Sequence, residues 1–296
     1  TFDINNRYHL SAMTFLNPSS IVKYTQSNQF HDFIPDWIVA TVTVLFFFLV
    51  AETALPFQRQ FSLDDLTISH PFAIKERVSG ILCIEIAAFV PLFVILTSLL
   101  VKYQQGAFSS HQQALHCLQI SVLGLIISLS LNGVITDILK IWIARPRPDF
   151  LERCGPAPGT PLHELVDVNV CTAPLGKALL IDGMKSTPSG HSSISFGGLF
   201  YLTLWLLGQF KLFQNRESPQ YVYKYFLAFS PLSLATYIAL SRTQDYRHHF
   251  TDIVLGGAIG ISFAWWSYHH YFNKLVSEES HKPIDSETLT ELLLPH

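Results

Sequence analysis

Charged side chains are scarce in this sequence. Only 14% of its 296 residues are charged, whereas a soluble domain carries about 25%, and 49% are hydrophobic. The chain contains 23 Phe, and its mean hydropathy is +0.30. A composition of this kind indicates a protein of the lipid bilayer.

A basic stripe is also absent. The formal net charge is -3, and Lys and Arg are scattered along the chain. Proteins that bind nucleic acid concentrate positive charge on one face, so we expect no nucleic-acid partner. We also expect no cleavable signal peptide, because residues 1–35 are polar and mixed, with no basic stretch before an apolar one.

Cysteine is rare, with four in the chain. Cys83 and Cys117 lie in or beside apolar runs, whereas Cys154 and Cys171 flank a polar loop rich in Pro and Gly. Only the second pair is placed to form a disulfide, which an oxidising lumen or the cell exterior permits and the cytosol does not. The spacing leaves this pairing open.

What the sequence does contain is six apolar segments, each close to the ~20 residues that a membrane-spanning helix needs. They cover residues 37–56, 79–101, 116–139, 192–213, 224–240 and 253–272. The sequence therefore predicts an all-α, polytopic membrane protein with six transmembrane helices and both termini on one side.

The predicted domain organisation follows these segments. A polar N-terminal segment covers residues 1–35, the six-helix domain residues 36–273, and a flexible C-terminal tail residues 274–296. The longest loop, residues 149–187, contains no convincing span. We expect this loop to form a cap outside the membrane.

A charged stretch between the last two apolar segments runs from Ser241 to Asp252 and contains two Arg and two His. Charges beside hydrocarbon cost several kcal/mol unless they contact water or a ligand. If six helices alternate in direction, two other stretches lie at the same membrane face. One is the end of the third segment near Lys140 and Arg147, and the other is residues 188–191, where small capping residues open the fourth helix.

The chemistry of these stretches points to phosphate. Three cations, Lys140, Arg147 and Arg242, beside a helix N-terminus are typical of a site for a compact, multiply charged anion. His248 and Asp252 are four residues apart, so at the start of a helix they share a face, and the carboxylate can accept one imidazole N–H. The other ring nitrogen is then free to attack phosphorus.

His191 comes from a different helix and is the predicted acid/base. It can protonate the leaving oxygen and later take a proton from water, which completes a double displacement through a phosphohistidine. Two other interpretations stay open here. The histidines and Asp252 have side chains that bind metals, although the nearby cations would repel a divalent ion. A transporter also concentrates charge at helix ends.

Together the motifs resemble those of the type 2 phosphatidic acid phosphatase superfamily, which includes the lipid phosphate phosphatases. The chain carries the family's three motifs in order and with similar spacing: Lys140-x6-Arg147-Pro148, Pro188-Ser189-Gly190-His191, and Ser241-Arg242-x5-His248-x3-Asp252. Residues 65–71, 147–150 and 241–250 are similar to fungal diacylglycerol pyrophosphate phosphatases in particular.

The resemblance implies a hydrolase that uses no metal and no cofactor and takes a phospholipid substrate from the bilayer. It implies removal of the terminal phosphate of diacylglycerol pyrophosphate, and action on phosphatidate. The same fold also serves phosphatases of sphingoid-base phosphates and dolichyl pyrophosphate. By position, the resemblance makes His248 the nucleophile, Asp252 its partner and His191 the acid/base, with these phosphate binders: Lys140, Arg147, Arg242, Ser189 and Gly190.

The resemblance further implies a multi-pass protein of the vacuole or another endomembrane, with the active site in the lumen. Charge alone does not set this orientation. The site side carries 11 Lys and Arg and the terminal side 8, but both carry 8 once Lys140, Arg147 and Arg242 are set aside. Nothing in the sequence indicates the oligomeric state.

Overall fold

Helices are the main secondary structure of the described residues, joined by turns and loops. The computed structural model describes residues 17–214 and 221–284, and these contain no β-strand, so the predicted all-α class is confirmed. In chain order the helices are α2 (Pro18–Thr25), α3 (Asn28–His31), α4 (Ile34–Phe46), the π-helical η1 (Phe47–Ala51), the short η2 (Leu66–Ile68), α5 (Gly80–Gln104), α6 (His111–Ile143), α7 (Phe150–Cys154), the short η3 (Val168–Val170), α8 (Lys177–Gly183), α9 (Gly190–Phe210), α10 (Val222–Gln244) and α11 (Phe250–Tyr271).

Five described helical stretches are long and apolar enough to cross a membrane: Asn28–Ala51, Gly80–Gln104, His111–Ile143, Gly190–Phe210 and Phe250–Tyr271. They correspond to five of the six predicted segments. The other segment forms α10, whose 23 residues extend for about 35 Å. It is not among the five, and it carries Lys224 together with several Tyr, Ser and Thr that make it more polar.

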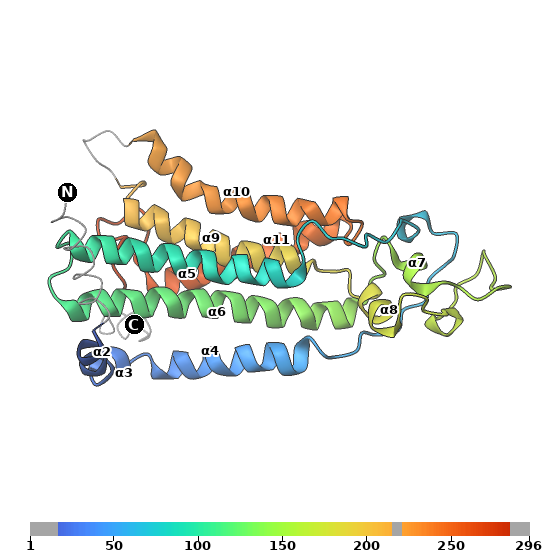
Figure 1. Cartoon of the computed structure of the whole chain (residues 1–296), viewed down its shortest axis with the longest axis horizontal. Helices are drawn as coiled ribbons and strands as arrows, with labels where there is room; N and C mark the ends of the chain where they lie inside the picture. Colours follow the sequence, from blue (N-terminus) through green and yellow to red (C-terminus); the bar gives the residue numbers. More distant parts are fainter. Residues whose placement is uncertain (1–16, 215–220, 285–296) are drawn as a thin grey trace, which may run out of the picture.

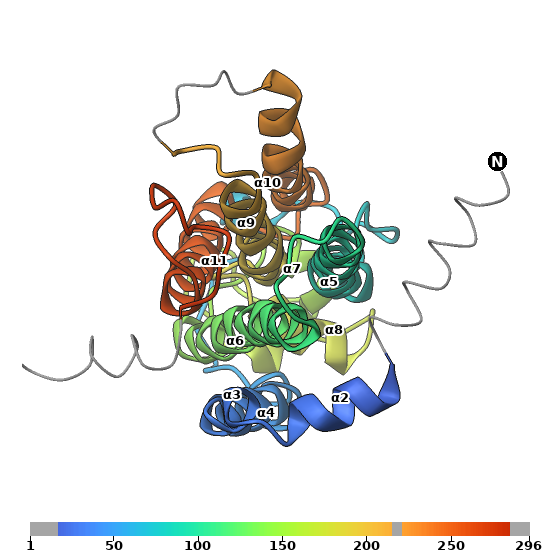
Figure 2. The ribbon, with the colours of Figure 1, turned by 90° about the vertical axis from the view of Figure 1, so that its left-hand side faces the viewer.

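Helix α9 lies in the middle of the bundle, with α5, α6, α10 and α11 around it (Figure 2). Trp205 and Tyr201 of α9 are fully buried, and both bond to Ser121 of α6. Trp205 Nε1 donates to Ser121 Oγ at 2.9 Å, and the Tyr201 hydroxyl donates to the Ser121 carbonyl at 3.0 Å. Because α9 is central, its first residues lie among the ends of its neighbours.

Helices α9 and α11 approach closely at two glycines of α11, Gly256 and Gly260. A Cβ added to Gly256 would lie 2.4 Å from the carbonyl oxygen of Ser189, whereas one added to Gly257 would meet only the Phe196 ring at 3.4 Å. Near this contact Ser189 N donates to the Asp252 carbonyl at 2.9 Å. The glycines thus allow the starts of the two helices to lie side by side.

The long loop between α6 and α9 forms a cap at the end of the bundle away from α2 and α3 (Figure 1). A disulfide joins Cys154 to Cys171, so the pairing that the sequence leaves open is present. Arg153 is fully buried and forms ion pairs with Asp149 and Asp182, each at 2.8 Å. These links tie α7 and α8 together.

At the other end, the chain after α11 folds back onto the bundle. Ile284 N donates to the Tyr271 carbonyl at 2.9 Å, and Gln209 Nε2 of α9 donates to the His281 carbonyl at 3.0 Å. Of the predicted terminal segments, residues 1–16 and 285–296 lie outside the described residues.

Candidate active site

A cavity of about 410 Å³ lies at the capped end of the bundle. Six of the eight predicted site residues line it: Lys140, Arg147, Gly190, His191, Arg242 and His248. The other two, Ser189 and Asp252, are fully buried and are not part of the lining. The structure therefore brings residues from the ends of α6 and α10, the start of α9 and the turn before α11 to one place.

Lys140 lies near the end of α6, with its ammonium group beside the start of α9. Its Nζ is 2.9 Å from Asp137 Oδ1. A Cβ added to Gly190 would lie only 2.7 Å from the same Nζ, so the glycine leaves the space that the ammonium group occupies. The ammonium and the free backbone N–H groups at a helix start both favour an anion.

Arg147 is held in place by the cap. Its Nε donates to the Asp182 carbonyl at 2.9 Å and its Nη2 to Asp182 Oδ1 at 2.7 Å, while Nη1 donates to the Arg247 carbonyl at 3.2 Å. Burial raises the pKa of Asp182, but Arg147 and Arg153 outweigh it and lower this pKa to about 2. Asp182 therefore stays ionised at neutral pH and keeps the guanidinium in the cavity.

Arg242 lies near the end of α10 and is fully buried. Its Nη1 donates to Glu76 Oε2 at 3.0 Å and to the Val78 carbonyl at 2.6 Å, and its Nη2 donates to Asp245 Oδ2. His191 Nε2 lies 2.9 Å from Nη1 of this arginine and 3.1 Å from the Val78 carbonyl. The segment before α5 thus fixes both the arginine and the predicted acid/base.

His248 lies in the turn between α10 and α11 and is only 3% exposed. Its Nδ1 is 2.7 Å from the Ser186 carbonyl, which can only accept, so the proton is on Nδ1 and the lone pair on Nε2. That Nε2 lies 3.4 Å from Nη1 of Arg147. Burial, together with Arg147 and other nearby cations, lowers the pKa of His248 well below its usual value.

Asp252 does not accept the hydrogen bond that the sequence predicts from His248. The distance from His248 Nδ1 to Asp252 Oδ2 is 4.0 Å, because the Ser186 carbonyl is nearer and takes the N–H. The carboxylate instead accepts from Ser186 Oγ at 2.6 Å, from Arg145 Nη1 at 2.7 Å and from the Thr187 hydroxyl. It contacts the segment that holds the ring, and not the ring itself.

Ser189 has a role in the helix and does not line the cavity. Its Oγ accepts from Ser192 N at 3.4 Å, as the N-cap of α9. The side chain is therefore occupied at the helix start, whose next two residues, Gly190 and His191, do line the cavity.

Residues without a predicted role complete the site. Arg247 forms an ion pair with Glu76 at 2.9 Å, and His249 N donates to Asp252 Oδ2 at 3.0 Å. Arg145, which donates to Asp252, also has no predicted role, although Arg145-Pro146 repeats the Arg147-Pro148 pair two residues earlier. Asp182 and Glu76 follow no spacing relative to the motifs, so sequence reasoning missed them.

The lining of the cavity contains both acids and cations. In residues 17–214 and 221–284, no group of three His, Cys, Asp or Glu side chains is arranged to hold a metal ion. The lining contains four acids, and three of them form ion pairs with cations: Asp137 with Lys140, Asp182 with Arg147 and Glu76 with Arg242. The fourth acid is Glu52.

Comparison with known proteins agrees with the three motifs. Residues 121–275, which contain all of them, match the PAP2 superfamily. The chain belongs to the PAP2 superfamily. No solved structure matches this PAP2 chain.

Fungal and plant relatives match over most of the PAP2 chain. It is 41% identical to probable diacylglycerol pyrophosphate phosphatase 1 of Schizosaccharomyces pombe over 244 aligned residues. The aligned residues make up 81% of each protein. Diacylglycerol pyrophosphate phosphatase 1 of Saccharomyces cerevisiae is 41% identical over 245 residues, again 81% of each. Lipid phosphate phosphatase 1 of Arabidopsis thaliana is 34% identical over 254 residues, 84% of this chain and 71% of the relative. The resemblance inferred from the motifs is confirmed.

Proposed function

We propose that this PAP2 protein is an integral membrane phosphatase that hydrolyses the terminal phosphate of diacylglycerol pyrophosphate and also acts on phosphatidate. Two relatives named for the first substrate share 41% identity with it over 81% of the chain. The observation that carries the proposal is the state of His248, whose unprotonated Nε2 lies 3.4 Å from Arg147 in a cavity lined by further cations.

The proposed reaction has two displacements. Nε2 of His248 attacks the terminal phosphorus while Lys140, Arg147 and Arg242 bind its oxygens, and the bond from phosphorus to the leaving oxygen breaks. His191 gives this oxygen a proton, which releases phosphatidate and leaves a phosphohistidine. His191 then takes a proton from water, the water oxygen attacks phosphorus, the P–N bond breaks, and inorganic phosphate leaves.

The surroundings of His248 support this role. Because the Ser186 carbonyl holds Nδ1–H, the ring cannot turn its protonated nitrogen toward the substrate. Positive charge develops on the ring as the P–N bond forms, and both the carbonyl dipole and the Asp252 carboxylate 4.0 Å away stabilise it. No step requires a metal.

We also propose that α10 is a sixth membrane crossing. The start of α9 and the end of α10 meet at the active site, where His191 and Arg242 are 2.9 Å apart, and α10 packs along α9 (Figure 1). Helix α10 therefore runs the depth of the bundle. With this crossing, the bundle returns the chain to the side on which α4 begins.

The Cys154–Cys171 disulfide supports a lumenal active site. A disulfide persists in an oxidising compartment and is rare in the cytosol. Since the cap carries the disulfide and Asp182 of the same cap binds Arg147, we place cap and active site in the lumen of the vacuole or another endomembrane.

The proposal is tested by phosphate release from a lipid panel in detergent. The panel holds diacylglycerol pyrophosphate, phosphatidate, a sphingoid-base phosphate and dolichyl pyrophosphate. We expect the wild-type protein to favour the first lipid and to keep its rate in EDTA. His248→Ala should lower the rate by at least about three orders of magnitude, because it removes the nucleophile.

The matched control is His163→Ala, since His163 is exposed in the cap and pairs with Asp64 away from the cavity. Its rate should equal that of the wild type. Substantial turnover by His248→Ala would refute the nucleophile, and loss of activity in EDTA would restore the metal interpretation. A wild-type protein that releases no phosphate from any lipid would favour a transporter.

A further inference from the structure

Two acids, Glu52 and Asp137, lie side by side in the lining of the active-site cavity. Glu52 comes directly after η1, and Asp137 lies on α6, three residues before Lys140. A carboxylate repels a phosphate that binds beside it. Two neighbouring acids in a cavity lined by Lys140 and Arg147 therefore need an explanation.

Asp137 uses only one of its two oxygens in the contacts of the site. Its Oδ1 is 2.9 Å from Lys140 Nζ. The side chain is buried, and no donor in residues 17–214 and 221–284 bonds to its Oδ2. A buried carboxylate oxygen without a donor is costly. A neighbouring acid that carries a proton would supply the missing donor.

Glu52 is the neighbour that can carry this proton. It lies just beyond the apolar stretch that ends at Ala51. Burial raises the pKa of Glu52, and the charge of Asp137 and a hydrogen bond between the two acids raise it further. Lys140 of α6 and Lys185 of the cap lower this pKa, but they do not cancel the rise. Two carboxyl groups in contact hold one proton more firmly than a lone acid does.

The backbone on both sides fixes the place of Glu52. Lys185 Nζ donates to the Glu52 carbonyl at 3.2 Å, which ties the residue to the cap. Glu52 N donates to the Phe47 carbonyl at 3.0 Å, which closes the π-helical turn of η1. Gly133 of α6 leaves room for the Phe47 ring, since a Cβ there would lie 2.9 Å from it. Turns of this kind are frequent at functional sites.

We propose that Glu52 is a positioning residue of the active site, which as a neutral acid donates a hydrogen bond to Asp137 and leaves Lys140 to bind phosphate. The inference rests on the proposed function, from which it takes phosphate as the ligand. With Glu52 neutral, the two acids carry one negative charge, which Lys140 balances. With Glu52 ionised, a second carboxylate attracts the Lys140 ammonium group and repels the phosphate oxygens.

The sign of the pH dependence follows from this state of Glu52. An acid with a raised pKa is neutral at low pH and ionises only as the pH rises through that pKa. Phosphate binding should therefore be strongest at acid pH and weaken on the alkaline side. An acidic lumen keeps Glu52 in its neutral form.

The test is the apparent Kd of inorganic phosphate between about pH 5 and about pH 8, across the range where a raised carboxyl pKa falls. The rise of the thermal unfolding midpoint with phosphate concentration gives the Kd. Every protein carries His248→Ala, so that no phosphohistidine forms. The parent is compared with Glu52→Gln, whose amide can donate to Asp137 but cannot ionise.

The ratio of the two Kd values removes the titration of phosphate itself, which is the same for both proteins. We expect the parent to bind as tightly as Glu52→Gln at the acid end and at least about threefold more weakly at the alkaline end. Glu164→Gln is the matched control, because Glu164 is exposed in the cap and does not line the cavity. Its Kd should equal that of the parent at every pH. A ratio for Glu52→Gln that does not change with pH would refute the inference.

Asp137→Asn provides a second test that does not depend on Glu52→Gln alone. It removes a charge that raises the pKa of Glu52, so phosphate binding should begin to weaken at lower pH than in the parent. The double variant with Glu52→Gln should lose this pH step. The unfolding midpoint without phosphate shows that each variant folds. A step at the same pH in Asp137→Asn and the parent would contradict the pairing of the two acids.

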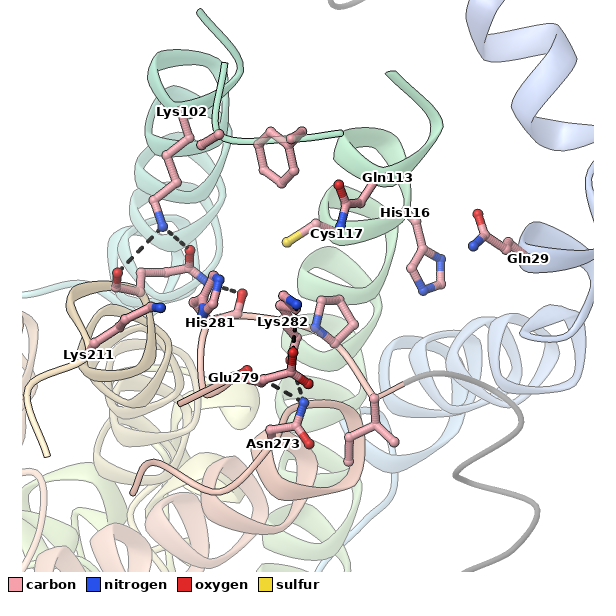
Figure 3. A pocket seen from close by; sticks show the side chains of 15 residues that line it. Gln29, Lys102, Gln113, His116, Cys117, Lys211, Asn273, Glu279, His281 and Lys282 are labelled. Atoms are coloured by element: carbon pink, nitrogen blue, oxygen red, sulfur yellow. Dashed lines mark hydrogen bonds and ion pairs between the residues drawn. The ribbon is translucent and has the colours of Figure 1, made fainter. Parts of the chain in front are cut away.

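The site of the probe is checked separately, because Lys102 and other lysines line a cavity at the opposite end of α9 (Figure 3). Arg147→Gln should weaken phosphate binding, whereas Lys102→Gln should leave it unchanged. The reverse result would place the probe outside the active site and overturn the inference. Turnover is not part of this readout, so a protein that hydrolyses no lipid would refute the proposed function by a different measurement.

Discussion

His248 combines two features that a nucleophilic histidine needs. Burial and the neighbouring Arg147 lower its pKa, so the ring stays neutral. The Ser186 carbonyl then fixes which nitrogen carries the proton. An exposed histidine with an ordinary pKa near 6.5 would be partly protonated in an acidic lumen and would lose its lone pair.

A pH profile tests this state of His248. Protonation removes the lone pair, so kcat/KM should fall only as the pH drops through the lowered pKa, well below about 6.5. Arg147→Gln removes a cation that lowers this pKa, so the acid limb should move to higher pH while the overall rate also falls.

The test is the pH at which kcat/KM falls on the acid side of the profile. The size of the rate is not a test, because Arg147 also binds the phosphate. Arg59→Gln is the control, because Arg59 is exposed and bonds to the Ile143 carbonyl outside the cavity. An acid limb that does not move in Arg147→Gln would show that this arginine does not set the pKa.

Individual residues show what motif spacing can and cannot predict. The sequence finds residues whose chemistry the reaction requires, such as Lys140 and His191, because they lie at the ends of apolar segments that alternate in direction and so meet at one membrane face. It cannot find Asp182 or the Ser186 carbonyl, since both reach the site through the folding of the cap. For the same reason the predicted direct bond from His248 to Asp252 differs from the observed contact at 4.0 Å.

At the scale of elements, the contact between α9 and α11 positions His191, at the start of α9, relative to His248, in the turn before α11. The two helices begin at the cavity, and they approach closely at Gly256 and again one turn later at Gly260, where an added Cβ would lie 2.3 Å from the Ser193 carbonyl oxygen. The glycines of α11 are readable in the sequence as small residues that permit close packing. Which of them faces α9 depends on the rotation of the helix, and only the structure gives it.

Neighbouring glycines of α11 provide a matched test. Gly256→Ala places a methyl group 2.4 Å from the Ser189 carbonyl, which belongs to the backbone and cannot move cheaply. We expect a loss of about 1–3 kcal/mol in stability, and lower activity as the helix starts separate.

Gly257→Ala is the control, because its Cβ meets the Phe196 ring at an ordinary 3.4 Å. Thermal unfolding in detergent and phosphate release measure both variants. Equal stability and activity of the two variants would contradict the importance of the close contact.

Hydropathy alone does not settle how many of the helices cross the membrane. Five helices satisfy length and composition, whereas α10 is long but more polar. Apolar runs predict spans well when most of a helix faces lipid. Helix α10 departs from this pattern at residues such as Lys224, so its crossing is inferred from the position of its end beside His191.

For the whole molecule, the active-site cavity and residues 273–284 lie at opposite ends of the bundle, since α9 begins at the cavity and Gln209 near its end bonds to His281. If the active site is lumenal, as proposed above, residues 273–284 lie on the cytosolic side. The two ends of the bundle then meet different solutions and different lipid leaflets.

Orientation can be measured by labelling single cysteines in sealed vesicles whose outer face is cytosolic. Lys274→Cys should react with a membrane-impermeant maleimide at once, and Glu164→Cys in the cap only after the vesicles are opened. Both positions are exposed, and native Cys83 and Cys117 are buried. The opposite order of labelling would place the active site in the cytosol.

The acceptor that holds His248 is a main-chain atom, the carbonyl oxygen of Ser186. Every amino acid brings the same oxygen to that position, so no codon change at residue 186 can delete it. Side-chain scanning of residue 186 would test only its hydroxyl and its bond to Asp252. In the course of evolution this catalytic support can be lost through displacement of the backbone, and not through replacement of the residue that carries it.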